Sequence, residues 1–190
     1  MSRAYRIQVS ESLTRVVHVD DGVATKLELL PILPKERMQA LLADELAAAG
    51  LAIQDGLARR TSAASGGDVT LEVELASGTV TVRIAHEESV VHKAEAARTI
   101  DLDRQAEGEA RLREELARSL ERKVEATTEE LRRRATMALE GALRDARDEL
   151  DRVVHRVTAA ALKEKARSLG EIEELSEDEA SGTLTIKVRV

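Results

Sequence analysis

Four histidines are the side chains of this sequence best suited to acid–base or metal chemistry: His18, His86, His92 and His155. A zinc site needs at least three convergent ligands, often at spacings such as HExxH, and neither that motif nor a comparable spacing occurs. The glutamates between His86 and His92 do not complete such a set. We therefore expect surface or sheet-edge histidines, with His155 paired locally to Asp151 one helical turn away, and no metal.

The other common catalytic motifs are also missing from the sequence. It has no cysteine, which excludes disulfides, thiolate catalysis and cysteine-based metal centres. No GxSxG, GxGxxG or GxxxxGK[ST] motif occurs, so neither a serine nucleophile nor a nucleotide site has support. The acidic run 171–179 contains Ile172 and Leu175, which favours a solvated strand or loop over a cation site. We expect no enzymatic activity and no cofactor.

The composition points to an aliphatic core and a long solvated helix. Aromatic residues make up 1% of the 190 residues, so Leu, Val, Ile and Ala must build the core. Charged residues make up 34%, and the segment 101–170 carries 16 basic and 16 acidic side chains. Such balance is typical of a helix with ion pairs along its surface. The net charge of −7 argues against nucleic acid as a partner.

No segment of the sequence predicts membrane insertion. There is no apolar stretch near the roughly 20 residues that a transmembrane helix needs, and residues 1–6 contain no apolar core of a signal peptide. The charge-balanced polar face of the helical segment makes peripheral membrane contact unexpected as well. A cytoplasmic protein is the expectation.

A short strand signature occurs twice, once on each side of the helical segment. Residues 76–84 (ASGTVTVRI) and 180–188 (ASGTLTIKV) match position by position. Each begins with a turn and continues with alternating polar and apolar residues, as in a half-buried strand. Strand elements are therefore expected before and after the helix, a layout typical of a scaffold or interaction protein.

An N-terminal α+β module is expected over residues 1–86. Its strands are predicted near residues 5–9, 15–19, 24–30, 51–53, 56–60, 69–73 and 80–84, with turns at 20–22 and 55–56, a small-residue loop at 62–67 and one packed helix from Pro34 to Gly50. That helix should bury Met38, Leu41, Leu42 and Leu46. Residues 87–100 are predicted to form an irregular bridge, and residues 170–190 a C-terminal strand element that joins a sheet.

Residues 101–169 have a continuous helical pattern. The segment has no proline, and an aliphatic stripe recurs mostly every four residues. As one helix it would span roughly 100 Å, and we expect its stripe to need a partner. A helical hairpin turning within 126–138 or at Gly141 would instead cover the stripe within the chain. The fold class is therefore α+β: a small, mostly antiparallel β module with one packed helix, then a long helical stalk or hairpin and a C-terminal strand.

We predict that the stripe is the interaction site of a self-associating protein, most simply a homodimer. The residues expected to carry it are Leu112, Leu116, Leu120, Leu139, Leu143, Leu150, Val153 and Val157. The competing hypothesis is a monomeric adaptor or substrate-recruiting module, in which the stripe is covered internally.

Three segments together resemble a known family. They are residues 3–13 (RAYRIQVSESL), residues 27–34 (LELLPILP), and residues 150–158 (LDRVVHRVT) with the exit that follows to Ile172. The chain is similar to an accessory domain family of bacterial ternary systems, gene neighbourhoods that pair FtsH-like or MoxR-like AAA+ ATPases with von Willebrand factor A proteins. The resemblance implies a non-enzymatic accessory role with an ATPase among the partners, and it transfers no functional residue.

Overall fold

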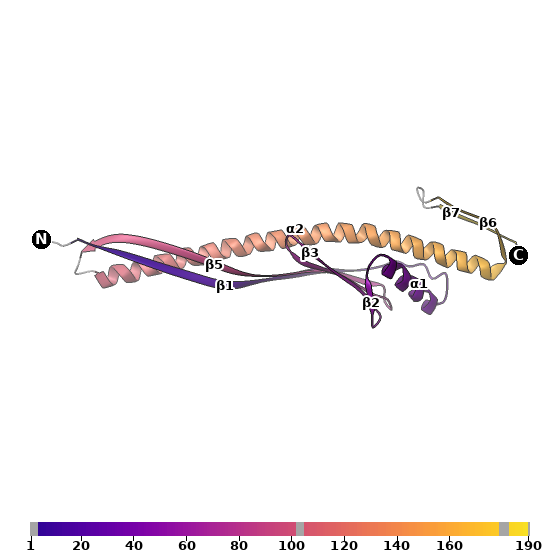
Figure 1. Ribbon diagram of the computed structural model, residues 1–190, viewed down its shortest axis with the longest axis horizontal. Coiled ribbons are helices and arrows are strands. Elements are labelled where there is room, and N and C mark those ends of the chain that lie inside the picture. Colours follow the sequence, from indigo (N-terminus) through magenta and orange to yellow (C-terminus); the bar gives the residue numbers. More distant parts are fainter. Residues whose placement is uncertain (1–3, 102–104, 179–182, 190) are drawn as a thin grey trace.

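The chain forms an elongated rod built on one long helix (Figure 1). The computed structural model describes residues 4–101, 105–178 and 183–189. In chain order the elements are β1 (Ala4–Lys26), α1 (Lys35–Ala48), β2 (Ala52–Gln54), β3 (Leu57–Ala64), β4 (Gly67–Glu74), β5 (Thr79–Asp101), α2 (Gln105–Leu169), β6 (Glu171–Asp178) and β7 (Thr183–Arg189). The predicted α+β class is confirmed.

Two strands of 23 residues each, β1 and β5, form a ribbon that runs along the rod. They pair antiparallel without interruption, from Ala4 opposite Asp101 to Lys26 opposite Thr79. The turn predicted at residues 20–22 is wrong, because Gly22 pairs with Arg83 in mid-strand. A Cβ on Gly22 would lie 2.9 Å from Arg83 Cγ, so glycine there permits a close approach of two strands.

The irregular bridge predicted at residues 87–100 is also wrong, since this segment is the far half of β5. Its alternation is hidden in the sequence because its helix-facing positions are His92, Ala94 and Ala96 as well as Val90, and alanine and histidine give a weak strand signal. Its backbone is instead held by the β1 partner, about 80 residues earlier in the chain at Leu13 opposite His92.

The ribbon widens into a five-stranded sheet of order β1-β5-β4-β3-β2. The predicted turn at Asp55-Gly56 is confirmed, with φ of 50° and 79°, the positive values of a tight hairpin. The predicted β4–β5 hairpin is confirmed as well, with Val73 opposite Val80. The loop predicted at 62–67 is shorter than expected, because β3 continues to Ala64 and pairs with Gly67.

Helix α1 covers this wide end of the sheet and packs on α2. It begins after Pro34 and ends before Gly50, which adopts a φ of 86°. Its buried face is the predicted one, Met38, Leu41, Leu42 and Leu46.

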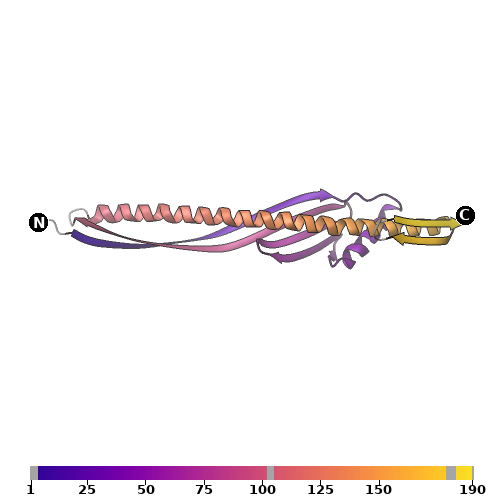
Figure 2. The ribbon, with the colours of Figure 1, turned by 90° about the horizontal axis from the view of Figure 1, so that it is seen from above.

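Helix α2 is unbroken over 65 residues, so the hairpin alternative is excluded. At 1.5 Å per residue it is roughly 100 Å long. Its first half lies along the two-stranded ribbon, and its second half lies against the wide sheet and α1 (Figures 1 and 2).

The last two strands form a separate antiparallel pair that turns back along the end of α2 (Figure 2). Strand β7 therefore joins a sheet, as expected, but its partner is β6. In Figure 1 this hairpin lies on the opposite side of α2 from α1. The apolar residues of β7, Leu184, Ile186 and Val188, are half-buried.

Candidate interaction surfaces

The predicted aliphatic stripe of α2 is buried within its own chain. Seven of its eight side chains are at most 6% exposed, and the eighth, Leu143, is partly buried against the same core. The expectation that an unbroken helix needs a partner for its stripe is wrong for this chain, because the sheet and α1 cover it. Whether the stripe also meets a second chain stays a prediction.

The rod has two sections with separate buried clusters. In the thin section α2 lies on the two-stranded ribbon of β1 and β5, and in the thick section it lies on the wide sheet and α1. In the thin section, Leu112 and Leu116 form a small buried cluster with Val9 of β1, and Ala94 and Ala96 of β5 pack against it. In the thick section, Leu139, Leu150, Val153 and Val157 belong to one large core with α1, β3, β4 and β5. The buried cluster of the thin section is much smaller than the large core, so we expect the thin section to have the lower local stability.

Arg60 connects three elements at the thick end. From β3, its Nη1 donates to the carbonyl of Ala49 at the end of α1, at 3.0 Å. The same guanidinium makes a two-pronged contact with Glu149 of α2, at 2.8 Å and 2.5 Å. The hydrogen bonds from Arg60 lower the pKa of Glu149, against the opposing effect of its partial burial. Sequence reasoning missed Arg60, because nothing local distinguishes it from its neighbour Arg59.

Two further ion pairs join α1 to α2. Arg156 donates to Glu45 at 2.5 Å, and Arg37 donates from Nε to Glu164 at 2.9 Å. The hydrogen bond from Arg37 is the main cause of the lowered pKa of Glu164. With Arg60, these contacts fix the position of α1 on α2.

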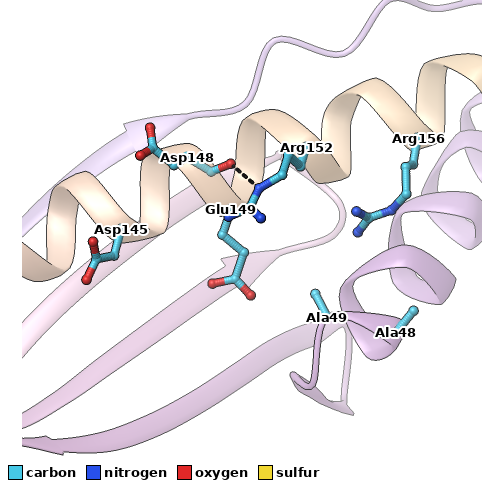
Figure 3. A pocket seen from close by; sticks show the side chains of 7 residues that line it. All are labelled: Ala48, Ala49, Asp145, Asp148, Glu149, Arg152 and Arg156. Atoms are coloured by element: carbon cyan, nitrogen blue, oxygen red, sulfur yellow. Dashed lines mark hydrogen bonds between the residues drawn. The ribbon is translucent and has the colours of Figure 1, made fainter. Parts of the chain in front are cut away.

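An open groove lies between the end of α1 and α2 (Figure 3). It is lined by Ala48, Ala49, Asp145, Asp148, Glu149, Arg152 and Arg156. Three of its five charged groups are engaged: Glu149 with Arg60, Arg156 with Glu45, and Arg152 Nε with the backbone carbonyl of Asp148 at 3.0 Å. The groove thus holds structural ion pairs, and its lining contains no serine, threonine, cysteine, lysine or histidine side chain.

The histidines form no common site. His18 lies 3.5 Å from Glu87, His86 lies 3.2 Å from Glu88, and His92 bonds the Thr127 hydroxyl of α2 at 3.0 Å. Among the residues that the structure describes, no three His, Cys, Asp or Glu side chains are placed to hold a metal ion.

The outer face of α2 is charged along its length. Arg133 and Arg134 both bond Glu130, at 2.9 Å each, and these bonds lower the pKa of Glu130, that from Arg133 most. Within the described part of the chain, no helix has the length and apolar character needed to cross a bilayer.

Comparison with known proteins identifies the family. The family model for the FtsH ternary system domain X5 matches residues 1–190, the whole chain, and the chain belongs to this family. The predicted resemblance to an accessory domain of a bacterial ternary system is thereby confirmed. No curated protein and no solved structure matches the chain.

Proposed function

We propose that this member of the FtsH ternary system domain X5 family is a non-enzymatic structural and interaction component of an AAA+ ATPase-linked system, acting in the cytoplasm. The observation that carries the proposal is the family match over the full chain, whose name suggests an accessory domain of an FtsH-associated system. Fold alone does not establish function, so the partner remains part of the proposal.

The architecture supports such a role. Most of the described chain forms a rod, in which two 23-residue strands pack along a 65-residue helix. The ion pairs at the thick end hold α1 and β3 against α2. A rod of this kind suits spacing or docking of other proteins better than it suits catalysis.

The direct test is binding to the ATPase. The purified chain would be mixed with the FtsH-type ATPase of the same system, and the mass of the complex measured by light scattering, with ATP turnover recorded in parallel. We expect a complex in which the chain itself hydrolyses nothing. The absence of a complex, with and without ATP, would contradict the proposed partner.

We propose self-association as part of this function, and the eight stripe residues can serve it in two ways. They can form a seam between chains only if α2 leaves its own sheet for that of another copy. Their burial within one chain supports the other role, in which they hold the rod together. In that role the stripe needs no second chain to cover it, which also suits the second candidate function, a monomeric adaptor.

Replacing Leu143 and Leu150 together by Asp separates the two roles. If the stripe is an intermolecular seam, the variant should become a smaller species that keeps its helical circular dichroism. If the stripe holds the rod together, the cooperative unfolding transition should be lost. The matched control is Met137→Asp, on the same helix at a position that is 61% exposed.

A further inference from the structure

The outer edge of β1 is the longest open backbone edge among the strands that the structure describes. β1 is the first strand in the order of the sheet, and no other described strand pairs on its far side. A long edge without proline presents unpaired N–H and C=O groups to a further strand. Both prolines of the sequence, Pro31 and Pro34, follow β1, so neither blocks this edge.

At four pairs of positions equidistant from Leu13, the residue types along this edge are complementary. Two apolar pairs are equidistant from it, Val9 with Val17 and Ile7 with Val19, and these four side chains are buried on the helix side of the ribbon. Two opposite-charge pairs are also equidistant from it, Glu11 with Arg15 and Arg6 with Asp20.

From this complementarity we propose that a second copy of the chain binds along β1, in an antiparallel β1–β1 interface with Leu13 at the two-fold axis. Residue n of one copy then lies opposite residue 26 − n of the other, over residues 4–22. Residues n and 26 − n are both odd or both even, and alternate residues of a strand lie on the same face. Helix-facing residues of one copy therefore lie opposite helix-facing residues of the other. The sheets of the two copies become continuous, and the interface is self-complementary, as two-fold symmetry requires.

The charges favour this partner. In a single chain, Glu11 and Arg15 lie opposite Ala94 and Val90 of β5, which cannot neutralise them. Glu11 approaches Arg113 only at 3.9 Å, and none of the ion pairs between described residues includes Arg15. In the proposed interface each Glu11 lies opposite an Arg15 of the second copy, and each Arg6 opposite an Asp20. Four opposite-charge cross-strand pairs result.

Neighbouring registers lose this match. If the axis moves by one residue, to residue 12 or 14, Glu11 faces Leu13 or Val17. If it moves by two, to residue 11 or 15, either Glu11 faces Glu11 or Arg15 faces Arg15, and like charges repel. The sequence of β1 therefore selects one register.

The position of α2 is compatible with the pairing. Helix α2 contacts both β1 and β5 on one face of the ribbon. Strands lie about 4.8 Å apart, so the centres of two adjoining two-stranded ribbons lie about 10 Å apart. That is the interaxial distance of packed helices, so the two copies of α2 could lie side by side beneath a continuous sheet.

Charge reversal tests both the surface and the register. Glu11→Arg and Arg15→Glu, each alone, place like charges opposite each other, and should weaken dimerisation at least about tenfold. Together they restore opposite charges, so the double variant should dimerise like the wild type. Masses would be measured by sedimentation equilibrium over a range of concentrations, with circular dichroism confirming that each variant is folded.

Cysteine cross-linking gives an independent measurement, because the chain has no cysteine of its own. In the proposed register the two Leu13→Cys residues face each other at the 4.5–5.5 Å Cα separation of opposite residues, within reach of a disulfide. Mild oxidation should therefore yield a covalent dimer. Val16→Cys is the matched control on the same strand: its two copies lie six residues apart along the strands, about 20 Å, and should not cross-link.

This inference rests on the self-association included in the proposed function, and the outcomes separate the two. A dimer that both single charge reversals leave unchanged overturns the β1 edge but keeps self-association. A double variant that fails to regain the dimer, or Val16→Cys cross-linking as well as Leu13→Cys, overturns the register. A wild type that stays monomeric at every concentration overturns the dimer, while binding to the ATPase is measured separately and tests the accessory role.

Discussion

The thin section of the rod should open independently of the thick section, and Leu116→Ala is the perturbation that reveals it. Leu116 is 6% exposed and belongs to a cluster whose only other buried members are Val9 and Leu112. Burial of this kind makes a Leu→Ala change cost about 2–5 kcal/mol. We expect the lower part of that range, about 2–3 kcal/mol, because a two-stranded ribbon can move toward the helix and partly close the cavity.

Hydrogen exchange is the assay, because it reports the opening of each segment separately. A loss of about 2–3 kcal/mol in local opening free energy corresponds to a roughly 30- to 150-fold loss of protection. We expect this loss in the amides of β1 and of α2 around Leu116. The amides of β4, whose Val69, Leu71 and Val73 lie in the large core, should exchange as in the wild type.

Equal loss of protection in both sections would refute the reasoning, since the rod would then unfold as one cooperative unit. Unchanged protection around Leu116 would refute it as well. Met137→Ala is the control, because that side chain is 61% exposed, and should change stability by less than about 0.5 kcal/mol.

Three further predictions concern the thick section. Gly66→Ala should reduce the free energy of unfolding by about 1–3 kcal/mol and lower the melting temperature, because a Cβ there would lie 2.7 Å from the carbonyl oxygen of Arg134 in α2. Gly141→Ala is the control and should not lower the melting temperature, because a Cβ there meets nothing within 4 Å. A double-mutant cycle with Arg60→Met and Glu149→Gln should give a coupling energy of about 1 kcal/mol in urea denaturation, and a value near zero would show that the ion pair contributes nothing. The pKa of Glu149 is lowered in the folded chain below 4.5, so its stabilising contribution is complete above about pH 4.5 and is lost as the pH falls through the folded value. The stability difference between the wild type and Glu149→Gln should therefore shrink in acid, and a difference that is constant from pH 7 to pH 3 would contradict this assignment.

Much of the helical structure could be predicted from the sequence because helices depend on local signals. The 65 residues of α2 contain no proline and keep their apolar stripe throughout, so nothing interrupts the backbone hydrogen bonds. Helix α1 was predictable from Pro34, Gly50 and its four buried residues for the same reason. The hairpin turns at Asp55-Gly56 and before Thr79 were predictable because their residue types specify the turn.

The length of β1 and β5 could not be predicted, because their pairing is non-local. Asp20-Asp21-Gly22 has the composition of a turn, yet in the sheet each of its residues lies opposite a β5 residue more than 60 positions later. The far half of β5 has too few β-branched residues for its sequence to predict a strand. In both segments the partner strand, and not the local sequence, keeps the backbone extended.

The same limit applies to the candidate site. A periodic aliphatic stripe predicts that one face of α2 is covered, but it cannot predict what covers it. Here the sheet and α1 do so, and seven of the eight stripe residues, which were expected to form a seam between chains, are buried within one chain. Arg60 was not predictable either, since its role depends on the meeting of three distant elements.

The repeated strand signature shows how sequence pattern and tertiary position contribute separately. Residues 79–84 of the first copy and 183–188 of the second each lie in the second strand of an antiparallel pair, so the pattern correctly specifies a strand and its apolar face. In the first copy Val80, Val82 and Ile84 are at most 2% exposed, because other strands flank them and the core covers that face. The equivalent residues of β7 are only half-buried, since a two-stranded hairpin beside the end of α2 supplies less cover. Burial therefore depends on what the rest of the chain places over a face, and a surface available to partners is found by asking what the fold leaves uncovered. The open edge of β1 is the surface found in this way. No sequence motif predicts it, but the strand order shows it.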